Sequence, residues 1–187
     1  MQPINVLLVD DQLSSLMALE DILESLDANL VKAGSARQAL RMMIEHSIDC
    51  ILLDVSMPEM DGFEFLQTLQ KAPAHKAIPV IMVTGKIFSE NETLRAYQYG
   101  AVDFLLKPLD TAMVFRKVSF FVNQARRIKS IDAITTHLRN MQTNVIGPLQ
   151  DVINGDDDEL KEKINPVVNC LRDLQVDWLS SLNEKNF

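Results

Sequence analysis

Four polar landmarks stand at the ends of four short apolar runs, and their side chains are of the kinds that handle phosphate. The first landmark is the acidic pair Asp10-Asp11, and the second is Asp54. Thr84 and Lys107 are the third and the fourth. If the four runs are parallel strands of one sheet, their carboxyl ends meet at one edge, where ligands bind in such sheets. The four landmarks are therefore predicted to share one pocket.

This set of side chains suits the transfer of a phosphoryl group to a carboxylate. Lysine and hard cations neutralise the oxygens of a phosphoryl group while it moves. Three carboxylates close together repel one another and favour a divalent cation, and an oxygen-rich site prefers Mg²⁺. We therefore expect Asp54 to be a phosphoryl-accepting carboxylate accompanied by a metal site, a hydroxyl group and a lysine.

The elements that must position these residues follow from alternating strand-like and helix-like runs. The expected strands span residues 4–9, 29–33, 50–53, 80–83 and 102–106. The expected helices follow the N-caps Ser14 and Ser35, span residues 63–71 and 89–99, and start again at Asp110. Five strands alternating with five helices predict an α/β fold, a doubly wound five-stranded parallel sheet of the flavodoxin-like kind. Right-handed crossovers place helices on both of its faces.

Length and composition are those of an ordinary globular protein. The 187-residue chain has room for one full domain and an appendage, and its 47% hydrophobic content is ample for a packed core. No apolar stretch approaches the roughly 20 residues that span a bilayer, so no membrane segment is expected. The start Met1-Gln2-Pro3 leaves no room for a signal peptide. Cys50 and Cys170 are expected to be reduced thiols, and the expected compartment is the cytoplasm.

Four motifs that follow one another along the chain resemble those of a known family. They are Val9-Asp10-Asp11, the segment Leu53-Asp54-Val55-Ser56-Met57-Pro58-Glu59-Met60-Asp61-Gly62, Val83-Thr84-Gly85 and Lys107-Pro108. On these motifs, residues 4 to about 123 resemble the receiver domain of two-component response regulators. The predicted organisation is a receiver domain over residues 1–123 and a helical extension over residues 124–187.

The resemblance implies a set of metal ligands and a phosphoryl donor. Asp54 becomes the acyl phosphate and binds Mg²⁺ directly, together with Asp11. Asp10 acts through a bound water, and the backbone carbonyl of Ser56 completes the ligands that the protein supplies. The donor is a sensor histidine kinase or a phosphotransfer protein. The chain is not expected to be an enzyme beyond its Mg²⁺-dependent self-phosphorylation and self-dephosphorylation at Asp54.

The resemblance also implies how the phosphoryl group is sensed. Lys107 pairs with a phosphoryl oxygen, and the bond from Lys107 to the next proline is usually cis in this family. Thr84 donates a hydrogen bond to the phosphoryl group and moves toward it. Phe104 occupies the aromatic switch position, where many relatives have tyrosine. Ser56 and Lys86 fall where relatives tune the lifetime of the acyl phosphate.

Helical periodicity continues after residue 123. Gly147-Pro148 should kink or break this helix, and residues 154–158 are expected to be a turn with an acidic helix start. An apolar stripe then runs from Leu160 to Leu182, with Pro166 either opening its helix or bending it. The stripe must be buried against the tail itself, the receiver or a second subunit. This favours a homodimer through residues 110–187 that acts by contact with a downstream protein.

Alternative functions of the tail stay open at this point. From Gln124 onward it has eight basic and ten acidic side chains and no clear helix-turn-helix segment, so DNA binding is not expected. A second hypothesis is a longer regulator with a nucleotide cyclase, phosphodiesterase or phosphatase domain beyond this chain. A third is a phosphotransfer protein that uses His137, although a lone histidine on a polar helix face is more often simply solvated.

Overall fold

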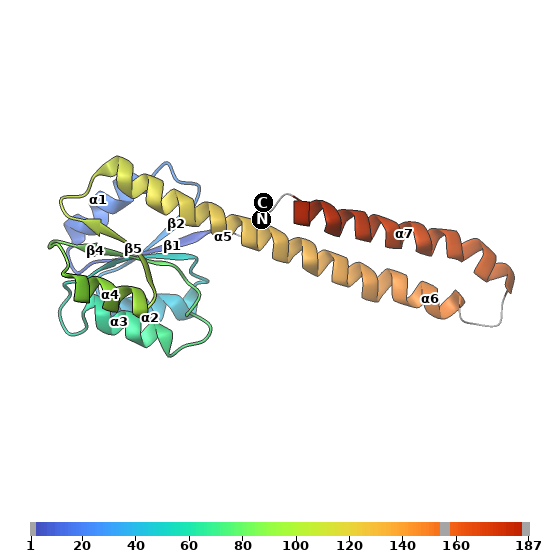
Figure 1. Ribbon diagram of the computed structural model, residues 1–187, viewed down its shortest axis with the longest axis horizontal. Coiled ribbons are helices and arrows are strands. Elements are labelled where there is room, and N and C mark those ends of the chain that lie inside the picture. The colour runs from blue at the N-terminus through green and yellow to red at the C-terminus, as the bar shows by residue number, and fades with distance from the viewer. Residues whose placement is uncertain (1–2, 154–157, 185–187) are drawn as a thin grey trace. The chain divides into compact units, whose positions relative to one another are not determined.

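A five-stranded parallel sheet forms the centre of the first part of the chain in the computed structural model, which describes residues 3–153 and 158–184 (Figure 1). The strand order is β2-β1-β3-β4-β5. The strands are β1 (Asn5–Val9), β2 (Asn29–Ala33), β3 (Cys50–Asp54), β4 (Val80–Thr84) and β5 (Ala101–Leu106). All neighbouring strands pair in parallel. The predicted doubly wound sheet is confirmed.

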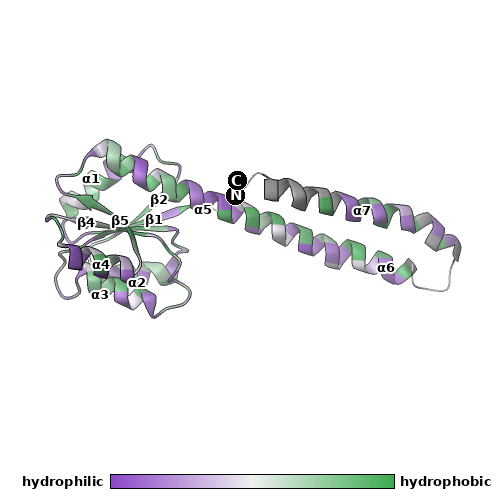
Figure 2. Ribbon diagram, viewed as in Figure 1, coloured by the Kyte–Doolittle hydropathy of each residue, from purple (hydrophilic) through white to green (hydrophobic). Residues whose placement is uncertain are grey.

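Helices cover both faces of this sheet, and a separate apolar core lies under each set. α1 (Leu13–Leu23) and the first part of α5 (Thr111–Met141) pack on one face. α2 (Ala36–Glu45), α3 (Gly62–Gln70) and α4 (Glu90–Gln98) pack on the other. Successive side chains of a strand point to opposite faces, and both faces of the inner strands β1, β3 and β4 are buried, which explains their unbroken apolar runs. Figure 2 shows these strands as predominantly hydrophobic.

The helix starts show which local signals decide the fold. The predicted N-cap Ser35 is confirmed, because its hydroxyl oxygen accepts a hydrogen bond from the Gln38 N–H at 3.2 Å. The predicted cap Ser14 is wrong, because α1 begins at Leu13. The Gln12 N–H donates to the Asp10 carboxylate at 2.8 Å, and the chain already turns at this point. α1 therefore begins one residue before Ser14, after Gln12 and without a side-chain cap.

α3 and α4 begin with reciprocal caps. Asp61 accepts from the Glu64 N–H while the Glu64 side chain accepts from the Asp61 N–H. Ser89 and Glu92 form the same arrangement at α4. Each pair satisfies two backbone donors that a helix end would otherwise leave without partners. Both caps lie just after strands that carry site residues, so they fix where the connecting loops end.

The chain divides into two compact units, residues 1–128 and 129–187. The division after Ile128 and the predicted boundary after residue 123 both fall inside α5, which runs unbroken for 31 residues. Asp110 caps this helix by accepting a hydrogen bond from the Met113 N–H at 2.7 Å. Within the first unit, α5 buries Val114, Val118 and Val122.

The second unit is helical throughout its described residues. α5 passes into a π-helical turn (Gln142–Ile146) and α6 (Gly147–Ile153), and α7 (Asp158–Glu184) packs against both of these. The expected interruption at Gly147-Pro148 takes the form of this π turn, in which the Gly147 N–H donates to the Gln142 carbonyl. Pro148 itself has no N–H to donate, which favours a change of helical register nearby.

The expectations for α7 are met in part. Pro166 lies inside the helix and does not open it. Leu138, Ile146 and Val168 are buried in this unit. Figure 2 shows hydrophilic and hydrophobic residues mixed along its helices. The expected turn at 154–158 falls mostly on residues 154–157, outside the described residues. Within the described ranges, no helix is both long and apolar enough to cross a bilayer.

The two cysteines are free thiols in contrasting settings, which confirms that they are not paired. Cys50 is fully buried in β3, and Cys170 is exposed on α7. Burial raises the pKa of the Cys50 thiol to about 12, because the surrounding apolar core disfavours the charged thiolate.

Candidate functional site

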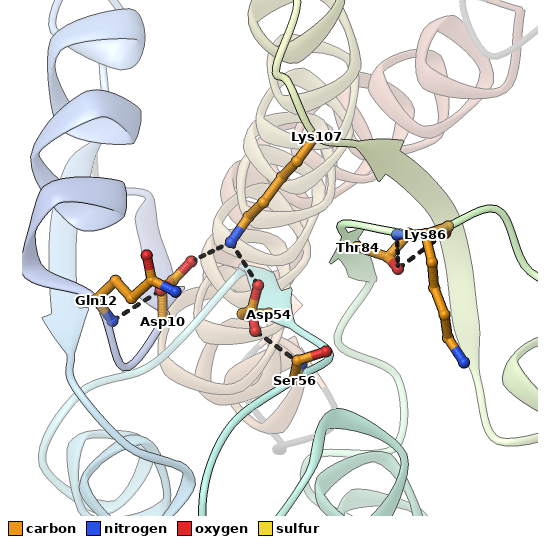
Figure 3. Close-up of polar contacts among 7 residues, drawn as sticks. All are labelled: Asp10, Gln12, Asp54, Ser56, Thr84, Lys86 and Lys107. Atoms are coloured by element: carbon orange, nitrogen blue, oxygen red, sulfur yellow. Dashed lines mark hydrogen bonds and ion pairs between the residues drawn. The ribbon is translucent and has the colours of Figure 1, made fainter.

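A lysine and two carboxylates meet at the carboxyl end of the sheet. Lys107 Nζ lies 2.6 Å from Asp54 Oδ1 and 2.9 Å from Asp10 Oδ2 (Figure 3). Asp10 directly follows β1, Asp54 ends β3, and Lys107 directly follows β5. The structure therefore brings together three of the four strand ends on which the predicted pocket depends, from residues far apart in the sequence.

Backbone donors hold both carboxylates in place. The Ser56 N–H donates to Asp54 Oδ2 at 2.7 Å, and the Gln12 N–H donates to Asp10 Oδ1 at 2.8 Å (Figure 3). Each aspartate thus has one oxygen fixed by the loop that follows it and one oxygen turned toward Lys107. Such charge-assisted bonds are short and strong, so they orient the oxygens that face the pocket.

The site is buried and carries a net negative charge. Asp10 and Asp54 are 1% and 5% exposed, and the one ammonium group between them is shared. The pKa of Lys107 is raised: burial lowers it, but the hydrogen bonds and attraction of Asp54 and Asp10 outweigh that effect. The lysine is therefore charged at neutral pH. Two carboxylates and one ammonium group leave one negative charge unbalanced, so the site favours a further cation.

The structure places the predicted Mg²⁺ ligands differently from one another. Asp10 and Asp54 are brought together, whereas the Asp11 side chain is exposed beside them. Among the described residues, no group of three histidine, cysteine, aspartate or glutamate side chains is gathered as a metal centre. The oxygen donors that are present, two oriented carboxylates, are of the type that Mg²⁺ prefers.

Thr84 is buried at the end of β4 and binds the backbone of the next loop. Its hydroxyl donates to the Lys86 carbonyl at 3.0 Å and accepts from the Lys86 N–H at 3.2 Å. The Lys107 N–H donates to the Thr84 carbonyl at 2.8 Å, which joins the ends of β4 and β5. The hydroxyl is thus held by the loop and does not contact the carboxylates in Figure 3.

The Lys86 side chain points away from Asp54 (Figure 3). Its ammonium group lies 2.7 Å from Glu92 Oε1, at the start of α4. This hydrogen bond, together with those from Ser89, lowers the pKa of Glu92 to about 2. Ser56 contacts the site through its backbone, and its side chain is exposed. The tuning of phosphate lifetime by Ser56 and Lys86 stays a prediction.

Phe104 lies in β5 within a group of aromatic rings. Its ring is 5.2 Å from Phe88 and 5.1 Å from Tyr97, measured between ring centroids, and both contacts are edge-to-face. Phe63 extends the group by its contact with Phe88 at 5.7 Å. The sequence pattern did not indicate this group, because its four rings come from α3, the loop between β4 and α4, α4 and β5.

Two further features complete the placement of the predicted residues. The peptide bond between Lys107 and Pro108 is cis, as expected. His137 is exposed on the part of α5 that belongs to the second unit. Its role in phosphotransfer stays a hypothesis.

Comparison with known proteins identifies the class to which this fold and site belong. Residues 6–119 match the response regulator receiver domain family. The chemotaxis protein CheY4 of Vibrio cholerae has a similar structure, with 27% sequence identity and a TM-score of 0.60, over 64% of this chain and 99% of that one. The chain belongs to the response regulator receiver domain family.

Curated relatives contain similar receivers within longer proteins. The transcriptional regulatory protein ZraR of Escherichia coli K12 is 36% identical over 146 residues, which are 77% of this chain and 31% of that protein. The cyclic di-GMP phosphodiesterase response regulator RpfG of Xanthomonas campestris is 34% identical over 110 residues, 57% of this chain and 28% of that protein. The chain thus spans less than a third of the length of these two relatives. Receiver domains are generally Mg²⁺-dependent and interact with histidine kinases or phosphotransfer proteins.

Proposed function

We propose that Asp54 accepts a phosphoryl group from a sensor histidine kinase or a phosphotransfer protein. The observation that carries this proposal is the buried Asp54 carboxylate, with one oxygen on the Ser56 N–H and the other on Lys107 Nζ. A carboxylate fixed in this way is oriented before the donor arrives, and orientation of the reacting atoms is a large part of the catalysis of phosphoryl transfer.

The transfer exchanges one bond for another at phosphorus. An oxygen of Asp54 bonds to the phosphorus of the donor's phosphohistidine while the P–N bond breaks. The electron pair of that bond stays on the imidazole nitrogen, which takes up a proton. Lys107, at 2.6 Å from Asp54 Oδ1, stabilises the negative charge on the phosphoryl oxygens.

Asp10, Asp11, Asp54 and the Ser56 carbonyl would hold Mg²⁺, which supplies further positive charge for the phosphoryl oxygens. The chemistry of the Asp10 and Asp54 carboxylates supports this, since they outnumber the cation between them. Asp11 is exposed, so it can turn toward the pocket without breaking a packed core. Self-dephosphorylation at Asp54 would use the same residues.

The phosphoryl group would be sensed by Thr84 and Phe104. The Thr84 hydroxyl now binds the Lys86 backbone, and donation to a phosphoryl oxygen would require it to leave the Lys86 carbonyl. That change frees the loop between β4 and α4, which carries Phe88 against the Phe104 ring. The output would then be an altered surface for a downstream protein.

Labelling with acetyl phosphate and Mg²⁺ tests the proposal. We expect the full chain to gain one phosphoryl group by intact-mass spectrometry, and the Asp54→Asn variant to gain none. Asp49→Asn, at the opposite end of β3, is the matched control and should be labelled like the wild type. Label that persists in Asp54→Asn would refute the assignment of Asp54.

We further propose that the chain forms a homodimer through residues 110–187. Support comes from the second unit, in which Val145 and Val167 stay exposed although the hairpin of α6 and α7 packs together. Covering them with a second copy would remove apolar surface from water. Light scattering on the full chain and on Val167→Asp should give a dimer and a monomer respectively. Two monomers would contradict the proposed homodimer.

The cytoplasmic location of the protein stays a prediction.

A second candidate is the regulatory part of a longer protein with an enzymatic output. The observation that favours it is the similarity to RpfG, a cyclic di-GMP phosphodiesterase response regulator of which the chain matches 28%. Sequencing the gene past the codon of residue 187 tests this candidate. An immediate stop codon would exclude it.

A further inference from the structure

The side chain of Lys86 is bound outside the pocket that its backbone borders. The Thr84 hydroxyl contacts both the N–H and the carbonyl of Lys86, which holds this backbone at the end of β4. The ammonium group, in contrast, lies 2.7 Å from Glu92 Oε1 at the start of α4, and Figure 3 shows the side chain extending away from Asp54. A cation that is anchored next to the site is therefore turned away from it.

Glu92 is held in place by the cap of its own helix. Its Oε2 accepts hydrogen bonds from the N–H and from the hydroxyl of Ser89, each at 2.9 Å. These bonds accompany the capping box that starts α4, and they leave Oε1 for the lysine. The Lys86 and Glu92 side chains are 64% and 32% exposed, and an exposed ion pair is usually weak because two flexible side chains must be ordered. Here one of the two is already ordered, so less entropy is lost when Lys86 binds.

The pocket around Asp54 attracts the same kind of group. Asp10 and Asp54 share one ammonium group, that of Lys107, which leaves one negative charge unbalanced. Lys86 lies two residues after β4, the strand beside β3, which ends at Asp54. Opposite charges attract one another within about 10 Å at 0.1 M salt before screening removes the effect. A Lys86 side chain released from Glu92 would therefore be drawn toward the pocket and would compete there with Mg²⁺.

We propose that Glu92 is a positioning residue that keeps the Lys86 ammonium group out of the Asp54 pocket and so leaves the unbalanced charge there to Mg²⁺. The inference rests on the proposed function, because it concerns the Mg²⁺ site that phosphoryl transfer would use. It gives Lys86 a different place from the one implied by the resemblance, in which this side chain acts on the acyl phosphate. Among the described residues, Lys107 alone supplies an ammonium group to the two carboxylates.

The experiment measures Mg²⁺ binding to the full, unphosphorylated chain by isothermal titration calorimetry. Glu92→Gln removes the charge that binds Lys86, and a glutamine side chain still completes a capping box. Glu90→Gln is the matched control, because Glu90 lies in the same first turn of α4 and loses the same charge. The double variant, Glu92→Gln with Lys86→Met, removes the released ammonium group as well. Labelling of Asp54 by acetyl phosphate is followed at low and at saturating Mg²⁺.

We expect Glu92→Gln to weaken Mg²⁺ binding by about three- to tenfold, because an ammonium group in the pocket repels a divalent cation. Glu90→Gln and the double variant should bind Mg²⁺ like the wild type. Labelling of Glu92→Gln should be slow at low Mg²⁺ and normal at saturating Mg²⁺. Damage to α4 would not produce this dependence on Mg²⁺, so the labelling separates a positioning role from a structural one.

Three results would overturn the inference. They are unchanged Mg²⁺ binding in Glu92→Gln, an equal loss in Glu90→Gln, and a loss in Glu92→Gln that persists in the double variant. The second result would assign the effect to the net charge of the surface, and the third would assign it to the structure of α4. Failure of the proposed function is distinct, because the wild-type chain would then carry no label at any Mg²⁺ concentration.

Discussion

At the scale of single residues, the pocket is defined by an imbalance of charge. Asp10 and Asp54 are almost fully buried, and each has Lys107 as its ion-pair partner. Removing the lysine leaves two adjacent carboxylates without a counter-charge, which is far costlier than losing an exposed ion pair. The lysine thus stabilises the fold as well as serving the proposed chemistry.

Lys107→Met should destabilise the protein by about 2–4 kcal/mol, because it removes one partner from buried charges. Asp54→Asn should cost about 1 kcal/mol or less, since Lys107 keeps Asp10 as a partner. Urea unfolding of the three proteins measures both values. Equal losses in the two variants would contradict this account of the site.

The stabilisation by Lys107 should also depend on pH in a defined direction. The folded pKa of Lys107 lies above its ordinary value of 10.5, because its bonds to Asp54 and Asp10 outweigh burial. Its stabilising effect is then fully present below that ordinary value and is lost as the pH rises through the folded pKa. The difference in urea midpoint between wild type and Lys107→Met should be constant from neutral pH upward and shrink only in strong alkali. A difference that already shrinks below about pH 9, more than one unit under the ordinary lysine pKa, would refute this account of the Lys107 charge.

At the scale of elements, the start of α3 is packed directly against the end of β3. A Cβ added to Gly62 would lie 2.8 Å from the Asp54 carbonyl oxygen and 3.0 Å from the Val55 Cα, and both are backbone atoms that cannot turn away. Gly85, after β4, has nothing within 4 Å of the same position. A side chain is therefore obstructed by the backbone at Gly62, whereas Gly85 has space for one.

Gly62→Ala should destabilise the protein by about 1–3 kcal/mol through forced movement of the β3 backbone. Gly85→Ala is the matched control, and its unfolding free energy should change by about 0.5 kcal/mol or less. Chemical denaturation is the measurement, with the slope of each curve checked for two-state behaviour. Similar values for both substitutions would show that the contact at Gly62 relaxes.

The sequence predicts the strands and the main site because each depends on a local signal. Five apolar runs and the polar residues at their ends are enough to predict the sheet and the edge at which Asp54 and Lys107 meet. The error at Ser14 arose because α1 begins at Leu13 without a side-chain cap, so no capping residue marks its start in the sequence. The ion pair between Lys117 and Asp103 joins residues 14 positions apart on α5 and β5, and no periodicity of the sequence indicates such a contact.

At the scale of the whole molecule, one helix belongs to two compact units of different construction. The first unit has a core on each face of a sheet, whereas the buried residues described in the second, Leu138, Ile146 and Val168, all belong to its helices or the π turn. On α7, Val168 is 2% exposed while its neighbour Val167 is 52% exposed. Adjacent residues of identical chemistry thus differ in role, because one packs inside the unit and the other lies on its surface.

Val168→Ala should destabilise the second unit by about 2 kcal/mol, because it removes buried methyl groups from the interior of this unit. Val167→Ala should leave the stability of a monomer nearly unchanged. Thermal unfolding followed by far-UV circular dichroism measures the loss, and labelling of Asp54 should be normal in both variants. Impaired labelling in Val168→Ala would mean that the receiver depends on the second unit to fold.

The contrast between the two thiols makes the native protein selectively modifiable. Cys50 is enclosed in β3 and stays protonated, whereas Cys170 faces solvent on α7. A maleimide dye added to the folded chain should react at Cys170 alone, because only a thiolate in contact with solvent attacks such a reagent. A spectroscopic probe can therefore be placed on the second unit of the wild-type sequence, without removing either cysteine.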